Sequence, residues 1–328
     1  MWCQTYPASP VVLDVLGTLD PAEIRAVARR YEPEAEEIFF FSASVGALYG
    51  VRRRDGSRVA IKVSTLFRDP SYFAEVQRLQ SALRAAGFPA PAPVRREGTV
   101  TVDEWLDEGE FRDGHESEVR RALATSLARF VELATATGIR PRREFLRPSG
   151  ALWPKPHNVL FDFEATAAGA EWIDEIARAA RSVPAAGREV VGHTDWAAKH
   201  VRFDAELRPT AVYDWDSVDT ELETRLVGGA AGSFTYTEEL AQPVVRCPSP
   251  DESAAFVADY EQARGEPFSA AERLAVDAAC VYLLAYAARC HHAVGGDTRD
   301  QRLEDHAAAL GLARFSGRAR DTRAGRCA

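Results

Sequence analysis

The sequence predicts an α+β fold with two lobes, a small β-rich lobe at residues 1–105 and a larger helical lobe at residues 106–328. Short runs of β-branched and aromatic residues, typical of strands, lie mostly before this boundary. After it, apolar residues recur at helical spacing. A chain of 328 residues is also long enough to bury a core in each lobe.

Residues 36–63 are predicted to form a strand pair joined by a tight turn. The dipeptide Asp55-Gly56, flanked by β-branched residues, is a strong hairpin signal. The strand after the turn, Arg58–Val63, contains Lys62 between apolar neighbours. Of the 40 basic residues three are lysines, which leaves 37 arginines (40 − 3). A lysine kept inside an apolar strand therefore indicates a site that needs a compact ammonium instead of a planar guanidinium.

The next segment is predicted to be a helix with a marked start and end. Asp69 suits the N-cap, Pro70 the first helical position and Gly87 the C-terminal cap. Glu75 lies close to the apolar stripe of this helix, where a carboxylate is costly without a cationic partner. We predict Lys62 as that partner, and a solvated Glu75 at the edge of the stripe is the alternative.

The rest of the chain is predicted to be mainly helical. After a break at Pro89–Pro93 and one more strand at Gly98–Val102, an apolar face runs over residues 119–134, and another helix begins near Ala170. The motif Ser269-Ala-Ala-Glu272 is a capping box. It opens a helix that is apolar on most sides, so we predict that this helix is buried.

Composition excludes several classes of function. A net charge of −9 and a pI of about 5.4 argue against a nucleic-acid-binding protein. The mean hydropathy is −0.25, and neither a membrane span nor a signal peptide is evident. We therefore expect a cytoplasmic protein that binds no membrane. The five cysteines are scattered and are expected to be reduced. Adjacent side chains in Cys290–His292 point in different directions on a helix, which disfavours a metal site there.

Two segments of the second lobe combine strand-like runs with acidic residues. Residues 190–203 contain Asp195, and residues 211–218 contain Asp214. Phosphoryl transfer needs one carboxylate to orient the attacking hydroxyl and accept its proton, and another to hold a metal against the nucleotide phosphates. The spacing of His193, Asp195, position 200 and Asp214 matches that template. We expect His193 to be structural and the neighbouring Trp196 to pack in the core.

With these residues the chain resembles the aminoglycoside phosphotransferase family, a branch of the protein-kinase-like fold. The resemblance rests on His193-Thr194-Asp195, position 200, Asp214-Trp215-Asp216, Lys62 and Glu75. It implies that Asp195 is the catalytic aspartate and that Asp214 is the main magnesium ligand. It also implies that Lys62 contacts the α- and β-phosphates of ATP or GTP and is held by Glu75.

The resemblance further implies a bilobal protein-kinase-like fold whose first lobe binds the nucleotide. Backbone amides from Ser44 to Ala47, including that of Gly46, would cover the phosphates. This loop has one glycine where protein kinases have three, and the resembling family is loose here as well. The segment Asp103–Leu106, which includes Glu104 and Leu106, would be the hinge that receives the adenine.

One position departs from the family pattern, because His200 stands where the family has asparagine. Magnesium prefers oxygen ligands, whereas an imidazole suits manganese better. Three roles for His200 remain open: weak metal ligation, a shifted preference toward manganese, or a hydrogen bond to Asp195. A second candidate for the asparagine, Asn158, has no aspartate five positions earlier and is interpreted as a loop residue.

The predicted function is an ATP-dependent small-molecule O-phosphotransferase that modifies a hydroxyl of an antibiotic- or metabolite-type acceptor. A pseudokinase that binds nucleotide without turnover is the alternative, motivated by His200. A protein kinase is disfavoured because no Asp-Phe-Gly or Ala-Pro-Glu motif follows Asp214. Lys199, the second lysine near a predicted site residue, has no assigned role, and the oligomeric state is also left open.

Overall fold

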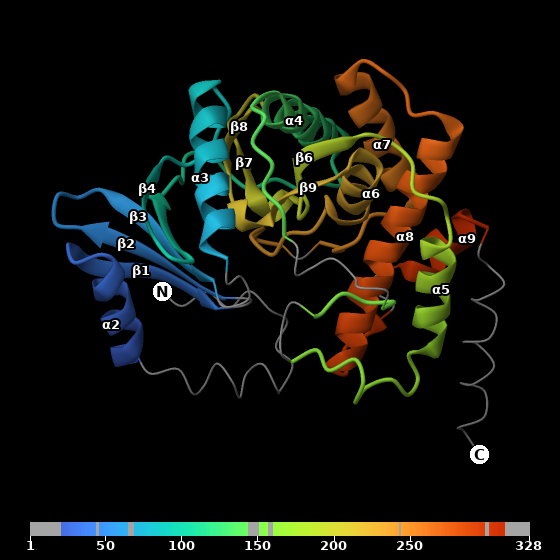
Figure 1. Cartoon of the computed structure of the whole chain (residues 1–328), viewed down its shortest axis with the longest axis horizontal. Coiled ribbons are helices and arrows are strands. Elements are labelled where there is room, and N and C mark those ends of the chain that lie inside the picture. Colours follow the sequence, from blue (N-terminus) through green and yellow to red (C-terminus); the bar gives the residue numbers. More distant parts are fainter. Residues whose placement is uncertain are drawn as a thin grey trace. The chain divides into compact units, whose positions relative to one another are not determined.

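The computed structural model describes residues 21–43, 46–64, 69–143, 151–156, 160–242, 244–298 and 302–311. The chain divides into two compact units, Met1–Asp107 and Glu108–Ala328 (Figure 1). The division lies two residues after the predicted boundary at residue 105. Strands dominate the first unit and helices the second, so the α+β class predicted from the sequence is confirmed.

The N-terminal unit is built on a five-stranded antiparallel sheet. Its order is β1 (Ala35–Ala43), β2 (Gly46–Arg53), β3 (Arg58–Ser64), β5 (Val100–Glu104) and β4 (Pro93–Glu97). The predicted strand pair at residues 36–63 is wrong in the number of strands. The range contains three strands, β1, β2 and β3, because β1 and β2 are antiparallel and not one continuous strand. The hairpin turn is confirmed: Gly56 has φ +84°, and the Ser57 amide donates to Asp55 Oδ1 at 2.9 Å.

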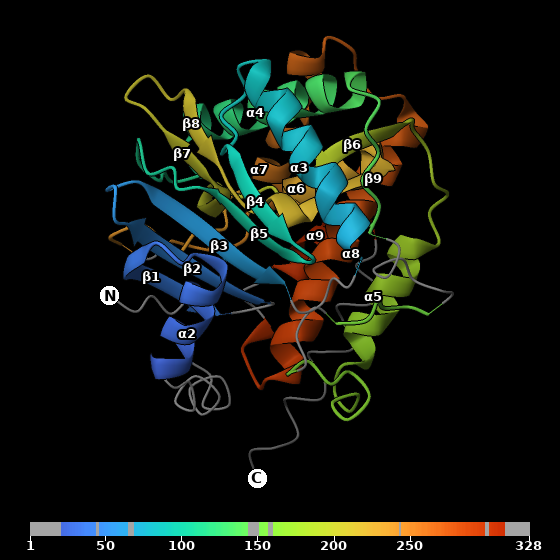
Figure 2. The same ribbon diagram turned by 60° about the vertical axis from the view of Figure 1, so that its left-hand side comes forward.

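Helices cover both faces of this sheet. Helix α2 (Pro21–Tyr31) contributes Ile24 and Ala28 to a core with Val59, Ile61 and Val102 (Figure 2). Alternation along β3 and β5 therefore turns Lys62 and Asp103 to the opposite face.

Helix α3 (Pro70–Ala85) follows β3 in the chain and has the predicted caps. The Asp69 side chain accepts from the Ser71 amide at 2.8 Å, Pro70 begins the helix, and Gly87 follows its end with φ +77°. Gln80 on α3 donates to the carbonyl of Pro91 at 2.7 Å, and Gln77 donates to the carbonyl of Arg95 in β4 at 3.2 Å. This flank of α3 therefore faces β4 and the loop before it.

The C-terminal unit is mainly helical. Its helices are α4 (Ser117–Ala136), α5 (Glu171–Arg181), α6 (Glu223–Ser233), α7 (Pro250–Arg264), α8 (Ala270–Ala293) and α9 (Leu303–Ala309) (Figure 1). The apolar face predicted for residues 119–134 is buried along α4. The predicted capping box is confirmed at the start of α8, where Ser269 and Glu272 bond reciprocally.

Helix α8 is long and apolar enough to cross a bilayer by length and composition, but 56% of its most apolar window is buried inside the protein. Its packing against α6 is very close: a Cβ added to Gly228 of α6 would lie 2.3 Å from the carbonyl oxygen of Val276. A core helix of a folded unit accounts for this apolar composition, as predicted.

Two small sheets stand between the helices. Strand β6 (Glu189–His193) pairs with β9 (Val218–Leu222), and β7 (Val201–Phe203) pairs with β8 (Pro209–Val212). The short 3-10 turns η2 (Ala198–His200) and η3 (Trp215–Ser217) lie at the junctions of these strands. The predicted catalytic and metal-binding residues lie in the two loops that contain these turns.

Candidate active site

The loop from β6 to β7 carries Asp195 and is fixed at several points. The Thr194 amide donates to the carbonyl of Ser217 at 2.9 Å, which links this loop to the turn before β9. Trp196 is fully buried, and its Nε1 donates to the carbonyl of Leu123 in α4 at 3.1 Å. The expected core position of Trp196 is therefore confirmed, and it anchors the loop one residue after Asp195.

The second loop carries Asp214 in an unusual backbone conformation. Asp214 has φ +63° and ψ +45°, the left-handed region that aspartate and asparagine tolerate best among residues other than glycine. The Ser217 hydroxyl donates to Asp214 Oδ2 at 2.5 Å, and the Ser217 amide donates to the Asp214 carbonyl at 2.9 Å. The Tyr213 amide also donates to the carbonyl of His200 at 2.9 Å, which joins this loop to the first one.

The two loops bring together the three polar residues predicted from the sequence. Ligand atoms of Asp195, His200 and Asp214 all lie within 4.8 Å of one another. Two carboxylates and an imidazole at this spacing fit a divalent cation, with carboxylate oxygen suited to magnesium and imidazole nitrogen to manganese. This is the group of potential metal ligands that the described part of the chain assembles.

Asp195 contacts two basic side chains through the same oxygen. Its Oδ2 atom lies 3.0 Å from His200 Nε2 and 3.5 Å from Lys199 Nζ. Burial opposes ionisation of Asp195, but the Lys199 charge and the His200 hydrogen bond outweigh it and hold the pKa of this carboxyl well below its usual range. Asp195 is therefore an ionised carboxylate at neutral pH, able to accept a hydrogen bond from an acceptor hydroxyl.

His200 makes a hydrogen bond to Asp195, one of the three roles left open for it, and the two metal-binding roles stay predictions. A ring nitrogen that donates a proton has no lone pair left for a metal. The hydrogen bond and metal ligation through Nε2 therefore exclude each other at any moment. An asparagine at this position would not face this competition, because its amide oxygen can bind a metal while its NH2 group donates a hydrogen bond.

His193 is a structural residue, as expected. Its Nε2 donates to the carbonyl of Tyr213 at 2.9 Å, and the side chain is fully buried next to the ring of Trp196, with centroids 5.6 Å apart. Burial, reinforced by the nearby His200, lowers the pKa of His193 to about 4. The ring is therefore neutral at physiological pH and joins the two loops through one hydrogen bond.

Sequence reasoning missed Arg143, which braces the same loop. Its guanidinium donates to the hydroxyl of Thr194, and its Nε lies 3.6 Å from Asp219 Oδ2 in β9. The Arg143 amide also donates to Asp219 Oδ1 at 3.1 Å. No local motif marks Arg143, because its partners lie far along the chain and are met only after folding.

Lys199 also has a partner that the sequence did not indicate. Its ammonium lies 4.5 Å from the centroid of the Tyr236 ring, and its backbone amide donates to the carbonyl of Tyr236 at 3.0 Å. The Tyr236 hydroxyl donates to Glu238 at 3.3 Å, and Arg246 donates to the same Glu238 oxygen at 2.6 Å. The segment after α6 therefore forms a wall beside the Asp195 loop.

The N-terminal unit contains the residues predicted to bind nucleotide. Lys62 lies on β3 and Glu75 on α3, and both are half-buried. Helical spacing places Glu75 on the flank of α3 roughly opposite Gln77, and so away from β4. Gly46 begins β2, where a Cβ would meet the Val63 carbonyl oxygen at 2.2 Å. Ser44 lies outside the described residues.

A buried carboxylate that was not predicted as such lies near Lys62. Asp103 shares the α3 face of the sheet with Lys62, and its Oδ1 atom is buried without a hydrogen-bond partner in the described structure. Burial raises the pKa of Asp103 to about 6, although Gln77, Thr101 and the charge of Lys62 act in the opposite direction. The alternation of β5 could have indicated this burial, because Val102 faces the other core.

The predicted hinge residues are held by other parts of the first unit. Glu104 Oε2 accepts from Arg84 at 2.9 Å and from the Ala92 amide at 3.2 Å. Trp105 packs edge-on against Phe39, with centroids 4.9 Å apart. The side chain of Leu106 is half-buried. The carboxylate of Glu104 is thus a structural group, and a contact with a base at this position would use the backbone or Leu106.

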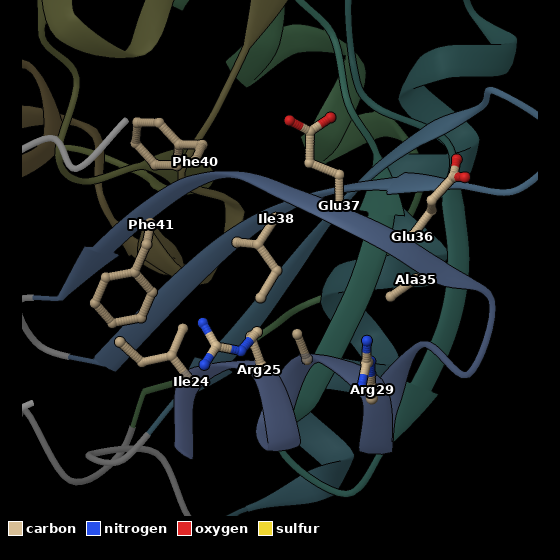
Figure 3. Close-up of a pocket in the computed structure, with 10 residues that line it drawn as sticks. Ile24, Arg25, Arg29, Ala35, Glu36, Glu37, Ile38, Phe40 and Phe41 are labelled. Atoms are coloured by element: carbon tan, nitrogen blue, oxygen red, sulfur yellow. The ribbon is translucent and has the colours of Figure 1, made fainter. Parts of the chain in front are cut away.

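A cavity of about 170 Å3 lies elsewhere in the first unit, between α2 and β1. Figure 3 shows Ile24 of α2 and Phe41 of β1 at its apolar floor, with Arg25 and Arg29 along the helix. None of the predicted site residues lines this cavity. This cavity therefore does not coincide with the predicted nucleotide-binding residues.

Comparison with known proteins follows the same residues. A family model described as "Phosphotransferase enzyme family" matches residues 49–221, which is more than half of the chain. The match begins in β2 and ends in β9, so it includes Lys62, Asp195, His200 and Asp214. A search of curated protein sequences gives no match.

Several solved structures share the fold at low sequence identity. The amicoumacin kinase hAmiN, in complex with AMP-PNP, Ca2+ and Ami, has a TM-score of 0.60 at 12% identity, over 94% of this chain and 96% of that one. The choline kinase LicA from Streptococcus pneumoniae has a TM-score of 0.51 at 8% identity, over 88% and 99%. An aminoglycoside phosphotransferase from Alicyclobacillus acidocaldarius has a TM-score of 0.50 at 14% identity, over 92% and 97%.

Proposed function

Because the chain belongs to the phosphotransferase enzyme family, we propose that it transfers the γ-phosphate of ATP to a hydroxyl group of a small molecule. The observation that carries this proposal is the convergence of Asp195, His200 and Asp214 within 4.8 Å on two linked loops. Transfer of a phosphoryl group depends mainly on positioning and charge, and these loops would supply both. GTP is the alternative donor.

Asp195 would act on the acceptor. Its Oδ2 atom contacts His200 and Lys199, and the Asp195 side chain is 44% exposed, so a hydroxyl could approach it from solvent. The ionised carboxylate would orient this hydroxyl and take its proton as the bond to phosphorus forms. The Lys199 charge and the His200 hydrogen bond would keep Asp195 ionised, and the buried Trp196 would keep the loop in place.

Asp214 would hold a divalent cation, magnesium or manganese, which neutralises charge on the nucleotide phosphates. Its left-handed backbone and the bond from Ser217 orient the carboxylate before any ligand binds. In the first unit, Lys62 would contact the α- and β-phosphates with Glu75 beside it. The amides near Ser44 and Gly46 would cover the phosphates, and the segment with Glu104 and Leu106 would receive the base.

The acceptor is proposed as an antibiotic- or metabolite-type compound with a reactive hydroxyl. The solved structures that share the fold include an amicoumacin kinase and a choline kinase, each named for a small molecule. We propose a cytoplasmic enzyme whose partners are the nucleotide and this acceptor, without nucleic acid or membrane.

A screen of hydroxyl-bearing antibiotics and metabolites tests the proposal. Purified protein, ATP and either Mg2+ or Mn2+ would be incubated with each compound, and phosphate incorporation would be followed by mass spectrometry. We expect a mass gain of one phosphoryl group on at least one compound, lost in Asp195→Asn. Phosphate found only on protein substrates would contradict the proposal.

A pseudokinase is the second candidate, and the hydrogen bond from His200 to Asp195 favours it, because this contact competes with metal ligation. Binding of AMP-PNP with metal, without turnover of ATP on any compound of the screen, would support it. Turnover on one acceptor would exclude it.

A further inference from the structure

We propose that Lys199 is a second catalytic residue, whose ammonium contacts the transferred phosphoryl group, and that Tyr236 is the residue that positions it. The inference rests on the proposed phosphotransferase function. It identifies a side chain of the protein that would contact the phosphoryl group during transfer, in addition to the metal and the acceptor. The template of two aspartates does not require a lysine at this position.

The position of Lys199 places its charge at the reacting centre. Its Nζ atom lies 3.5 Å from Asp195 Oδ2, and its side chain is 29% exposed, so it borders the space from which an acceptor reaches Asp195. A hydroxyl bound to Asp195 lies about 3 Å from the carboxylate, and the phosphorus about 3–3.5 Å beyond. The phosphoryl oxygens therefore lie within reach of an ammonium held at this distance from the carboxylate.

An ammonium can serve both groups at once. It carries three N–H donors that rotate freely about the last bond, so it can contact Asp195 and a phosphoryl oxygen together. The chain has 37 arginines and three lysines, yet lysine stands here. A guanidinium is a wide planar fork, whereas the ammonium contacts both Asp195 and the Tyr236 ring as a compact charge.

Tyr236 fixes where this charge lies. The ring lies 4.5 Å from Lys199 Nζ, and the two residues are also joined by a backbone hydrogen bond of 3.0 Å. Arg246 lies over the same ring at 5.6 Å and bonds to Glu238, which in turn accepts from the Tyr236 hydroxyl. The ring is thus held by its own partners, and its π-electrons attract the ammonium.

The transfer step balances with these residues. The acceptor oxygen forms a bond to the γ-phosphorus, and the bond between this phosphorus and the β–γ bridging oxygen breaks. ADP leaves with that electron pair, and the hydroxyl proton passes to Asp195. Lys199 keeps all of its protons and stabilises the charge on the equatorial oxygens during transfer.

Nucleotide binding tests the contact without knowledge of the acceptor. In Lys199→Met we expect the affinity for Mg·AMP-PNP to fall about 10-fold, which matches the loss of one hydrogen bond to a charged group. The affinity for Mg·ADP, which lacks the γ-phosphate, would stay within about twofold of the parent on the same basis. Lys155→Met is the matched control, because Lys155 lies exposed in the loop before α5 and would change neither affinity.

A double variant separates direct contact from an effect through Asp195. If Lys199 acted only by neutralising Asp195, then Lys199→Met in the Asp195→Asn background would leave the ratio of AMP-PNP to ADP affinity unchanged. That result would overturn the inference. We expect the ratio to fall about 10-fold in this background as well, because the contact is with phosphate.

Two further variants test the positioning role of Tyr236. Tyr236→Phe keeps the ring and would keep the ratio of AMP-PNP to ADP affinity, whereas Tyr236→Leu removes the ring and would lower the ratio toward that of Lys199→Met. A Tyr236→Leu protein with the parent's ratio would refute the positioning role. Thermal melting checks that each variant is folded, and Lys199→Met still decides whether Lys199 contacts the phosphate if Tyr236→Leu does not fold.

The outcomes distinguish this inference from the proposed function. Parent protein that binds no Mg·AMP-PNP would contradict the nucleotide chemistry itself. Parent protein that binds it, with an unchanged affinity ratio in Lys199→Met, would remove Lys199 from the phosphate and leave the proposed function standing. A selective loss of AMP-PNP affinity in both backgrounds is the expected result.

Discussion

At the scale of single residues, the main feature of the candidate site is one carboxylate oxygen that contacts two basic side chains. Asp195 Oδ2 lies 3.0 Å from His200 Nε2 and 3.5 Å from Lys199 Nζ. A histidine in this position is therefore already engaged before a metal arrives. The identity of residue 200 decides whether the site offers the metal a third ligand or offers Asp195 a hydrogen bond.

The variant His200→Asn tests this choice. An asparagine oxygen suits magnesium better than an imidazole does, so we expect the ratio of transfer rates with Mg2+ and Mn2+ to shift toward Mg2+. The measurement is the initial rate with each metal, using an acceptor found by the screen. His292→Asn is a control, since His292 bonds to the carbonyl of Ala168 in another part of the unit. An unchanged metal ratio would exclude His200 as a ligand.

Asp103 provides a test of stability against pH. Burial raises its pKa to about 6 in the folded chain, whereas a carboxyl in the unfolded chain has a pKa of about 4. The folded state therefore favours protonated Asp103. The stability that this contributes is present below about pH 4 and is lost as pH rises through about 6. Asp103→Asn removes the charge, so at pH 8 we expect the variant to be more stable by about 1–3 kcal/mol.

Urea unfolding at several pH values measures this difference. The gain from Asp103→Asn should shrink below pH 6 and vanish below about pH 4, where Asp103 becomes protonated in both states. Asp251→Asn, at an exposed position of α7, is the control and should show no comparable trend. A gain that is constant with pH would show that the charge of Asp103 is not its cause.

At the scale of secondary-structure elements, the contact of α6 with α8 depends on two adjacent glycines that differ in surroundings. A Cβ on Gly228 would lie 2.3 Å from the backbone oxygen of Val276, whereas a Cβ on Gly229 would meet nothing within 4 Å. The same substitution at neighbouring positions of one helix therefore has opposite consequences.

We expect Gly228→Ala to lower the free energy of unfolding by about 1–3 kcal/mol, because backbone of α8 cannot yield to the methyl group without shifting the helix. Gly229→Ala should raise it by about 0.5–1 kcal/mol, since alanine restricts the unfolded chain and favours a helix. Chemical denaturation of both variants measures the difference. Equal effects of the two substitutions would contradict the close packing of α6 on α8.

The elements that could be predicted are those with local signals. The caps of α3 and the box that opens α8 were predicted, because a side chain there bonds to backbone within three residues. Strand β4 was missed, because Pro93 was interpreted as a break, although a proline is tolerated at the first residue of an edge strand. The reversal between β1 and β2 was missed as well, since residues 43–46 contain no Asn-Gly or Asp-Gly signal.

The site divides in the same way. Asp195, His200 and Asp214 were predicted because fixed spacing along two loops carries them. The roles of Arg143 and Tyr236 were not predictable, because each meets its loop from a segment distant in sequence and bears no motif of its own. Spacing defines the chemistry of this site, and tertiary packing defines the residues that support it.

At the scale of the whole molecule, ligand binding should be visible as stability. A nucleotide that binds only the folded chain raises its free energy of unfolding, by about 2.7 kcal/mol at a concentration 100 times the dissociation constant. We expect Mg·AMP-PNP to raise the melting temperature of the parent and of Asp195→Asn. Asp214→Asn should lose most of the metal-dependent part of this increase, because a neutral amide oxygen binds a divalent cation more weakly than a carboxylate does.

Differential scanning calorimetry with AMP-PNP, with and without Mg2+, measures these shifts. Asparagine tolerates the left-handed backbone that Asp214 adopts, so Asp214→Asn tests the charge without backbone strain. A metal-dependent shift of full size in Asp214→Asn would remove this residue from the metal site.

The order of elements along the chain has a consequence for biosynthesis. Helices α5 and α6 both pack on α8, which is synthesised after them and spans residues 270–293. During translation, the apolar faces of α5 and α6 are synthesised before the helix against which they pack. The strands of the N-terminal unit all precede residue 107, so that unit can fold first. The unit with the candidate catalytic residues can therefore complete its core only after α8 has been synthesised.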